Sequence, residues 1–448
     1  MIQKGSQGAR TVNAGGLSGL SCTCMKTTPQ SGQAWRGYER ALIHLLIDMN
    51  NVWVAKSLNS KQKEEHMKKL TLRQRTRDVK RSIMFRRGQT GKRTKGKSFY
   101  YEVKWRKTNY WIDEQSRKGL DVQFVSKKKK GLILTLPPVM DFSNNYAVTV
   151  QHINAIRMLS ERKGIPSAGY QLASVNFCNL KKISTSAALV LTAELSKWDD
   201  ALRQRLTPKL AGWDRDILRN FYELGFFDLF KKSKNLKLDF GNESPNNKGK
   251  RFVKYLKGKC GEVAKTKVLK GEIIDLVGES IEKWIFLHSG LSEAITNVSH
   301  HAYPVEYGYK EYDKNWYLTG SYNIESKELK IVFYDQGVGI PKTLPASKVW
   351  EKALTVLAKI SSLERYRDEE LLKAAVELDR TSTEEDDRGK GLQDLLEFIR
   401  QRENGYLSIM SLRGLYKHSM NQGITKVKTE SFASPICGTL IIWSVSLD

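Results

Sequence analysis

Long apolar runs are missing from this chain of 448 residues. No stretch approaches the roughly 20 consecutive apolar residues that a membrane-spanning helix needs, so we expect no membrane span. The N-terminal stretch MIQKGSQGARTVNAGGLSGLSCTC is rich in Gly and Ser and lacks the apolar core of a secretory signal. We expect it to be either a disordered leader or a start placed upstream of Met25.

Cysteine is also scarce. The five cysteines are an odd number, and none belongs to a CxxC pair. Cys22 and Cys24 lie two positions apart without a second ligand pair, which argues against a zinc site. This usage suits a reducing compartment, so we expect a cytoplasmic protein. The sequence shows no internal repeats.

Acidic residues are too few to balance the basic ones, and the net charge is +27. Residues 51–130 hold 25 Lys or Arg against 7 Asp or Glu, an excess of 18. Such a block favours a polyanionic partner. Residues 56–107 also interleave aromatic side chains with these cations, which suits base stacking, although alternating aromatics also form the core face of a strand. Nucleic-acid contact through residues 56–130 is therefore one of two interpretations.

The length predicts two or three domains, and an apolar content of 40% suits globular folding. Composition shifts divide the chain into a leader and basic arm (1–98), a small α/β domain (99–232), a linker (233–252) and a C-terminal domain (253–448).

Local patterns predict the elements of these domains. In the middle of the chain we expect a hairpin turning at Thr108-Asn109, a strand at 131–136, a helix at 144–164, a strand and turn at 172–184, and helices at 185–206 and 214–230. From Arg251 we expect a helix, the helical stretch 291–304, strands at 316–324 and 328–335, a helical acidic insertion at 346–387, a helix at 391–401 and two closing strands.

The stretch LSEAITNVSHHAYP (291–304) carries polar side chains at every fourth position. Glu293, Asn297 and His301 would share one face of a helix, because fourth residues return to nearly the same angle. Leu291 and Ile295 supply an apolar side. The ladder is either a solvated polar face or one wall of a site.

Three further motifs follow in order: DQGVGI (335–340) after a strand, RGKGL (388–392) before a helix, and Gly438-Thr439 at the start of the last strand. Glycines let a backbone approach a ligand closely, and a glycine loop that enters a helix suits phosphate. Each motif alone is weak, but four in this order are far more specific.

EAITNVSHHAY, DQGVGI, RGKGL and the terminal GT together resemble the N box, the two glycine boxes and the threonine of the GHKL ATPases, and are most similar to the anti-sigma-factor serine kinases. The resemblance covers residues 253–448. It implies an α/β (α+β) chain with a Bergerat-type ATP-binding α/β sandwich at its C-terminus, and it implies ATP and Mg²⁺ as cofactors.

The resemblance also implies roles for matching positions. Glu293 would be the general base, Asn297 would bind Mg²⁺ and contact the nucleotide, and His301 would face the phosphates or pack as an ordinary histidine.

The glycine boxes complete this implied nucleotide site. Asp335 would accept the adenine amino group, with Thr439 supporting it through water. Gly337 and Gly339 would allow close approach of the nucleotide. The lid over the phosphates would be formed by Gly389, Lys390, Gly391 and Leu392.

Upstream, LASVNFCNLKKISTSAALVLTAEL resembles a sulfate-transporter and anti-sigma-antagonist (STAS) domain at its phosphoacceptor turn. The resemblance implies Thr185 as the acceptor, with Ser186 or Ser184 as substitutes. The Asp and Gly of that turn are missing here, and a helix N-cap cluster explains the same residues.

The predicted function is an ATP-binding regulator that is either a serine/threonine kinase or a slow ATPase. The alternative is a nucleotide-gated binding protein that controls a protein partner, a nucleic acid or a second copy of the chain. A sensor histidine kinase is a poorer fit, because His152 lacks an acidic neighbour.

Overall fold

The computed structural model describes most of the chain after residue 107. The described residues are 71, 74, 77, 108–125, 131–162, 170–231, 238, 240, 249–278, 281–347, 350–361, 364–378 and 391–447. Backbone contacts divide the chain into residues 1–96 and 97–448, and the architecture below belongs to the second unit. Most of the basic segment 56–130 lies outside the described residues.

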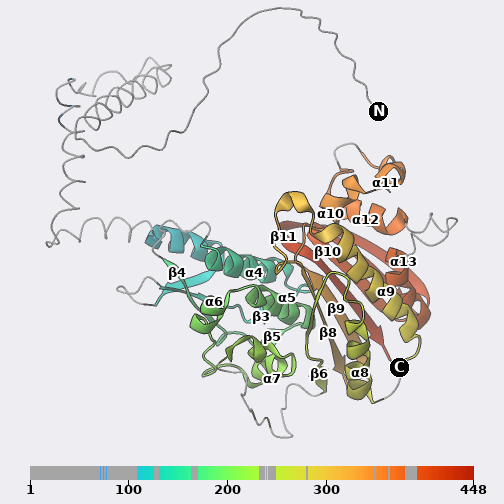
Figure 1. The fold of residues 1–448 in the computed structure, drawn as a ribbon, viewed down its shortest axis with the longest axis horizontal. Helices are drawn as coiled ribbons and strands as arrows, with labels where there is room; N and C mark the ends of the chain where they lie inside the picture. The colour runs from blue at the N-terminus through green and yellow to red at the C-terminus, as the bar shows by residue number, and fades with distance from the viewer. Residues whose placement is uncertain are drawn as a thin grey trace, which may run out of the picture. The chain divides into compact units, whose positions relative to one another are not determined.

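The fold is mixed α/β, as the sequence predicts, with a six-stranded antiparallel sheet in the C-terminal half (Figure 1). The hydrogen-bonded order is β10-β11-β9-β8-β6, and β7 also pairs with β8. Its strands are β6 (Lys250–Phe252), β7 (Leu256–Lys259), β8 (Asn315–Asn323), β9 (Glu328–Asp335), β10 (Gly405–Asn421) and β11 (Ile424–Ser446).

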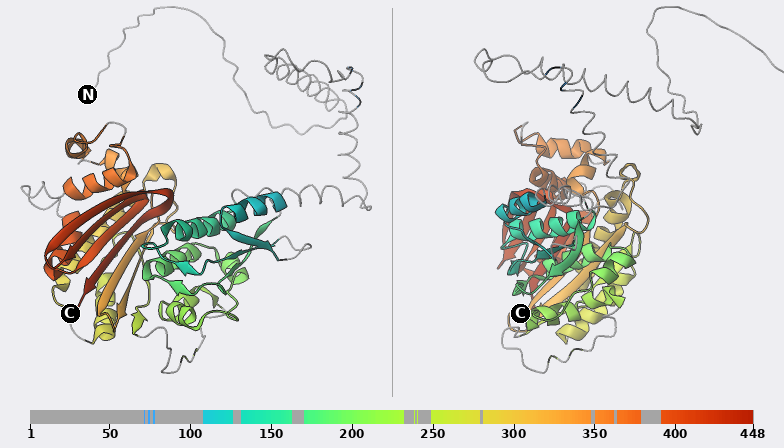
Figure 2. Two further views of the ribbon diagram at one scale, coloured as in Figure 1. Left: turned by 180° about the vertical axis from the view of Figure 1, so that it is seen from behind. Right: turned by 90° about the vertical axis from the view of Figure 1, so that its left-hand side faces the viewer.

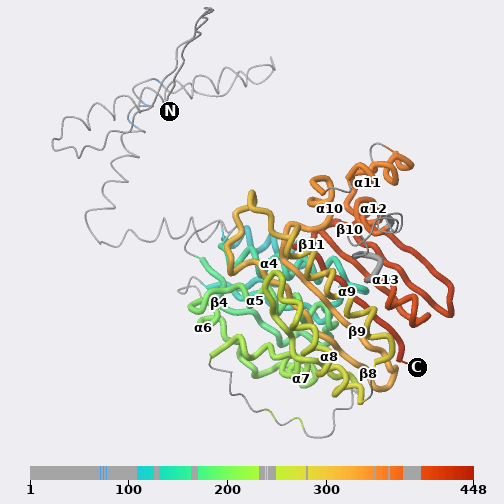
Figure 3. The backbone as a smooth tube through the Cα atoms, turned by 45° about the vertical axis from the view of Figure 1, so that its right-hand side comes forward, coloured from blue at the N-terminus to red at the C-terminus, as the bar shows by residue number. Residues whose placement is uncertain are grey.

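Helices cover one face of this sheet. The covering helices are α8 (Lys265–Val277), α9 (Trp284–Asn297) and α13 (Gly391–Arg402), and Figure 3 shows α8 and α9 beside β8 and β9. Alternate strand residues, such as Trp316, Phe333 and Trp443, join their core. This alternation explains why the strands could be recognised from sequence.

The middle segment, residues 108–231, supplies the layer on the other face. Its strands are β1 (Asp121–Phe124), β2 (Gly131–Thr135), β3 (Val139–Met140), β4 (Gln171–Asn176) and β5 (Lys182–Ile183), and its helices are α4 (Tyr146–Ser160), α5 (Thr185–Ser196), α6 (Asp200–Arg205) and α7 (Arg215–Glu223). The order β1-β2-β4 forms a small sheet, and β3 pairs with β5.

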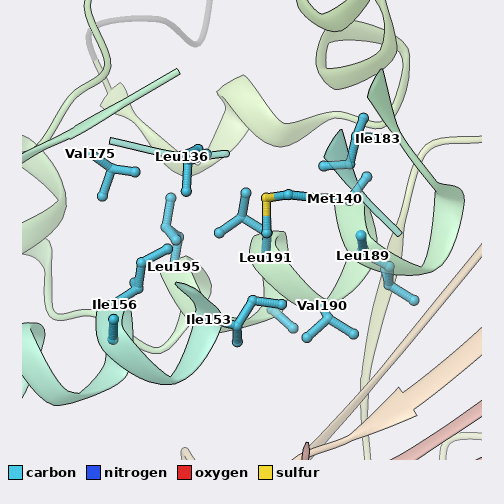
Figure 4. Packing of buried hydrophobic residues seen from close by; sticks show 14 of the residues in the cluster. Leu136, Met140, Ile153, Ile156, Val175, Ile183, Leu189, Val190, Leu191 and Leu195 are labelled. Carbon is cyan, nitrogen blue, oxygen red and sulfur yellow. The ribbon is translucent and has the colours of Figure 1, made fainter. Parts of the chain in front are cut away.

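Helix α5 has no exposed polar face, and all twelve of its residues are buried. A helix that is buried all round needs packing partners on every side. Figure 4 shows Leu191 and Leu195 of α5, with Ile153 of α4, packing near Leu136 and Met140. The same core includes Tyr334 and other residues of the six-stranded sheet. Helix α5 therefore lies between the middle segment and the sheet.

The closing hairpin of β10 and β11, drawn in red in Figure 2, folds back on itself. Register shifts flank Leu412, whose φ is +53°. At the tip, the Gln422 N–H donates to Asn404 Oδ1 at 2.9 Å, although Asn404 precedes the first residue of β10. The bend at Leu412 therefore returns the tip to the start of the hairpin.

Two predictions in the middle segment are wrong in detail. Residues 108–117 form a helix instead of a hairpin turn, because Thr108, Trp111 and Gln115 are buried at helical spacing. The predicted helix 185–206 is two helices, α5 and α6, because Asp199 accepts the Leu202 N–H at 2.7 Å and starts a new helix.

Two further boundaries differ from the sequence predictions. The helix predicted at 214–230 ends with α7, because Gly225 has a φ of +80° and a 3₁₀ turn follows at Phe226–Leu229. Strands β6 and β7, instead of a helix, follow Gly249, so the predicted linker 233–252 contains a strand that pairs with β8.

The acidic insertion is helical, as predicted. Its described residues include α11 (Trp350–Leu357) and α12 (Asp368–Leu378).

Candidate functional site

Helix α9 carries the first two side chains of the polar ladder. Asn297 Nδ2 donates to Glu293 Oε1 at 2.9 Å, and both residues are half-buried. Leu287, Leu291 and Ile295 fix the opposite side of the helix in the core. The amide and the carboxylate are therefore adjacent on one face of a packed helix.

His301 lies beyond the end of α9. The chain continues from α9 into a π-helical turn, Val298–Ala302, which contains His301. The residue is exposed, and its ring lies edge-on to His300 with centroids 5.9 Å apart. Of the three ladder residues, Glu293 and Asn297 are therefore joined by a hydrogen bond on α9, and His301 follows in the turn.

Asp335 ends β9 and is only 4% exposed. Its Oδ1 accepts the Gly337 N–H at 2.8 Å, and Thr439 lies opposite it on β11. Burial raises the pKa of Asp335 to about 6, while hydrogen bonds from the Gly337 N–H and from the N–H and hydroxyl of Thr439 act in the opposite direction. Thr439 therefore contacts Asp335 directly through its N–H and its hydroxyl.

The turn after Asp335 packs against the end of α9. The Val338 N–H donates to Ala302 O at 2.8 Å. A Cβ on Gly337 would lie 2.2 Å from the same oxygen, so only glycine fits there. Gly339 follows as the residue before α10 (Ile340–Thr343). This contact brings the Asp335 turn to the helix that carries Glu293.

Sequence reasoning missed three residues around the turn. Gly438 has a φ of +72°, and a Cβ there would lie 2.0 Å from Asp335 O. The Ser411 hydroxyl accepts the Ile340 N–H at 3.0 Å and donates to Gly438 O at 3.1 Å. The Tyr303 hydroxyl accepts the Gln336 N–H at 3.1 Å. Gly438 and Tyr303 stood inside the quoted motifs, whereas no short pattern marks Ser411.

The second glycine box is only partly described. Gly389 and Lys390 lie outside the described residues, and Gly391 and Leu392 are the first residues of α13.

The described end of the acidic insertion is firmly packed. Leu372 and Val376 of α12 belong to the core under the helices. Asp368 Oδ2 accepts the Arg413 N–H at 2.8 Å. Helix α12 is therefore part of the domain's packing.

The three candidate phosphoacceptors cluster at the start of α5. Ser184 caps the helix by accepting the Ala187 N–H at 3.3 Å. The hydroxyls of Thr185 and Ser321 on β8 are hydrogen-bonded at 2.7 Å, and Thr185 is 1% exposed. Ser186 is 5% exposed, with its Oγ 3.1 Å from that of Ser184. The N-cap interpretation is confirmed, and Thr185 faces the side of the sheet opposite to α9.

Among the described residues, no group of three or more His, Cys, Asp or Glu side chains converges as a metal site. Within that same part of the chain, no helix is long and apolar enough to cross a membrane. His152, the residue considered for a sensor histidine kinase, is buried in α4. It is 2% exposed, and its Nδ1 lies 2.8 Å from Val148 O.

No family model matches the chain, and no match is found among curated proteins.

Proposed function

We propose that the C-terminal domain binds Mg·ATP as a GHKL-type domain with a Bergerat-type fold, and that the chain is an ATP-dependent regulator. One observation carries the proposal. A buried carboxylate, Asp335, is held at the end of a strand against the end of the helix that bears Glu293 and Asn297.

The surroundings of Asp335 suit the recognition of an adenine. A carboxylate has about four acceptor positions, and the Gly337 N–H with the N–H and hydroxyl of Thr439 use three of them. A ligand that donates a hydrogen bond would complete the set. With a pKa of about 6, the carboxylate is mostly ionised at neutral pH and would accept the exocyclic amino group. Gly337 and Gly438 let the backbone of this turn lie against Ala302 O and Asp335 O, where a side chain would collide.

The donors on α9 suit Mg²⁺, which prefers oxygen ligands and keeps several waters. Asn297 uses its Nδ2 on Glu293, so its Oδ1 is the atom left for a metal. A set with few protein ligands is consistent with a cation held mainly by phosphates and water. Bound Mg²⁺ would neutralise charge on the phosphates.

Glu293 is the group that we propose as general base. Its carboxylate would take the proton of a water or a protein hydroxyl as the oxygen attacks the γ-phosphorus. The bond from the γ-phosphorus to the bridging oxygen would break, and ADP would leave with that oxygen. Attack by water would give ADP and phosphate, whereas attack by a hydroxyl would give ADP and a phosphorylated Ser or Thr.

Burial of Thr185 bears on the choice of acceptor. Its hydroxyl is hydrogen-bonded to Ser321 on the face of the sheet that lacks α9, so in this arrangement it cannot reach a phosphate beside Glu293. Hydrolysis, or transfer to another protein, is therefore favoured over transfer to the chain's own STAS-like turn. A nucleotide-gated binding protein remains the second candidate, because the middle segment contacts the turn that follows Asp335 through Gln336 and Glu194.

The identity of the regulated partner is part of the proposal. A protein would dock through the STAS-like middle segment, nucleic acid would bind the basic segment 56–130, and a second copy could join on ATP binding. The reducing cytoplasm remains the proposed location.

Calorimetry with Mg·ATP and a phosphate-release assay test the proposal directly. Glu293→Ala should slow turnover by about 10²–10⁴-fold while retaining affinity, and Asp335→Asn should weaken affinity. Glu272→Ala and Asp275→Asn, at exposed positions on α8, are the matched controls. Binding without turnover would favour the gated binding protein, and a wild-type protein that does not bind Mg·ATP would overturn the proposal.

A further inference from the structure

A buried ion pair joins α4 and α5 in the otherwise apolar core of the middle segment. Arg157 Nε donates to Glu194 Oε2 at 2.9 Å, and a second guanidinium nitrogen donates to Oε1. The Glu194 side chain is 3% exposed and that of Arg157 is 22% exposed. Burying such a pair costs desolvation energy, and apolar replacements are often as stable. Packing alone therefore does not account for these two residues.

The pair has a third member in the C-terminal domain. Gln336 Nε2 donates to Glu194 Oε1, and Gln336 is 1% exposed. Its Oε1 has no hydrogen-bond partner among the described residues, so Glu194 makes the side-chain hydrogen bond that fixes the amide. Gln336 stands between Asp335 and Gly337 in the chain.

The backbone of Gln336 is held from other directions. The Tyr303 hydroxyl accepts its N–H at 3.1 Å, and Cys437 Sγ lies 3.8 Å from its carbonyl oxygen. The turn that orients the Asp335 carboxylate is therefore set on one side by its own domain and on the other by α5. A shift of Glu194 would be transmitted to Asp335 through one intervening residue.

We infer that Glu194, held by Arg157, is a positioning residue for the nucleotide site. It fixes Gln336, so that the docking of α5 on the sheet and the binding of nucleotide at Asp335 favour each other. Such coupling is reciprocal: nucleotide binding strengthens the docking of the middle segment, and undocking weakens nucleotide binding. The inference rests on the proposed function, because it concerns the same site.

The first test replaces the ion pair by apolar side chains, as Arg157→Met with Glu194→Met. Calorimetry would measure Mg·ATP affinity at several pH values, and urea unfolding without nucleotide would report the fold. We expect a similar unfolding midpoint, a loss of affinity of about tenfold, and a change in the pH dependence that Asp335 gives to binding. Thr192→Val is the matched control, because Thr192 lies on α5 and its hydroxyl bonds only to Ala188 O within the helix.

The second test exchanges the partners and does not depend on removing the pair. Gln336→Glu alone places two carboxylates together and should weaken Mg·ATP binding. Adding Glu194→Gln restores one donor and one acceptor, and it should recover most of the affinity. A role in packing alone would not produce this rescue.

The outcomes separate the two proposals. If the wild type does not bind Mg·ATP, the proposed function fails. If the wild type binds, Asp335→Asn weakens binding, and the Met pair folds and binds like the wild type, the positioning role fails alone. If the Met pair does not fold, the exchange decides, since an absence of rescue would overturn the role of Glu194.

Discussion

The proposed role of Asp335 sets two requirements that oppose each other. Its carboxylate is buried, which favours the neutral form, yet the proposed contact with a nucleotide amino group requires the ionised form. The N–H of Gly337 and the groups of Thr439 meet the second requirement without exposing it to water. The balance leaves the pKa at about 6, within reach of ordinary buffers.

Nucleotide affinity should therefore depend on pH through Asp335. The pKa of this carboxyl is raised in the folded protein, so protonation below about pH 6 removes the acceptor and weakens binding by up to about tenfold per pH unit. The raised pKa of Asp335 affects folding in the opposite direction. Its contribution to the free energy of unfolding is fully present below pH 3.8, the ordinary pKa of the group, and is lost as the pH rises through about 6. Calorimetry between pH 5 and 8 would measure the dependence on binding.

Asp335→Asn is the reference for this measurement. Phosphate groups of the nucleotide titrate near pH 6 as well, and they affect the variant and the wild type equally. The difference between the two profiles therefore isolates Asp335. Parallel profiles would show that this carboxyl does not contact the nucleotide.

At the scale of elements, α5 is attached to the sheet at both of its ends. The hydroxyls of Thr185 and Ser321 are 2.7 Å apart, and those of Ser196 and Tyr317 are 2.6 Å apart. The apolar residues between these contacts fill the core. Thr185 and Ser196 thus each have a hydroxyl partner on β8, which makes the contact specific as well as apolar.

Changes at Thr185 should destabilise the protein according to what they leave unpaired. Thr185→Val leaves the Ser321 hydroxyl without this hydrogen-bond partner and should lower the free energy of unfolding by about 1–3 kcal/mol. Thr185→Asp buries a charge and should cost more than that. Urea unfolding at neutral pH measures both effects.

Thr185→Val combined with Ser321→Ala provides the control. Removing both hydroxyls should restore part of the loss, because neither partner is then left without a hydrogen bond. If Thr185→Asp were as stable as the wild type, the turn would be exposed in solution, and the STAS-like acceptor would again be a candidate.

The elements were predictable where periodicity was clear, and less so where the contact lay far away in the sequence. Strands β8 and β9 and helix α4 follow their apolar patterns closely. The sequence of α5 lacks a clear polar face, which indicates burial but does not show which element covers the helix, so its docking on the sheet could not be predicted. The π turn after Asn297 and the bend at Leu412 depend on tertiary packing.

The same limit applies to the residues of the candidate site. Motif spacing located Glu293, Asn297, Asp335 and Thr439, because each lies in an element whose geometry is regular. It could not predict the π turn in which His301 lies. It also could not identify Glu194, which is 142 residues from Gln336 in sequence.

At the scale of the whole molecule, the middle segment and the sheet share one core. Phe177 and Leu191 from the middle segment belong to the same buried cluster as Tyr334 and Ile442 from the sheet. Because the two layers share a core, separating them would expose apolar residues of both layers to water. The predicted boundary at 233–252 therefore separates two segments in sequence but not two independent cores.

We expect residues 97–448 to unfold in one cooperative transition. Hydrogen exchange in increasing urea should give the backbone amides of α5 and β9 the same free energy of opening, because undocking α5 exposes the inner face of β9. Saturating Mg·ATP, at about 100 times its dissociation constant, should raise both values together by about 2.7 kcal/mol. If the amides of α5 opened at lower urea than those of β9, the middle segment would be a separately folding unit. If nucleotide then protected β9 and left α5 unchanged, binding and docking would be independent, and Glu194 would have no part in the site.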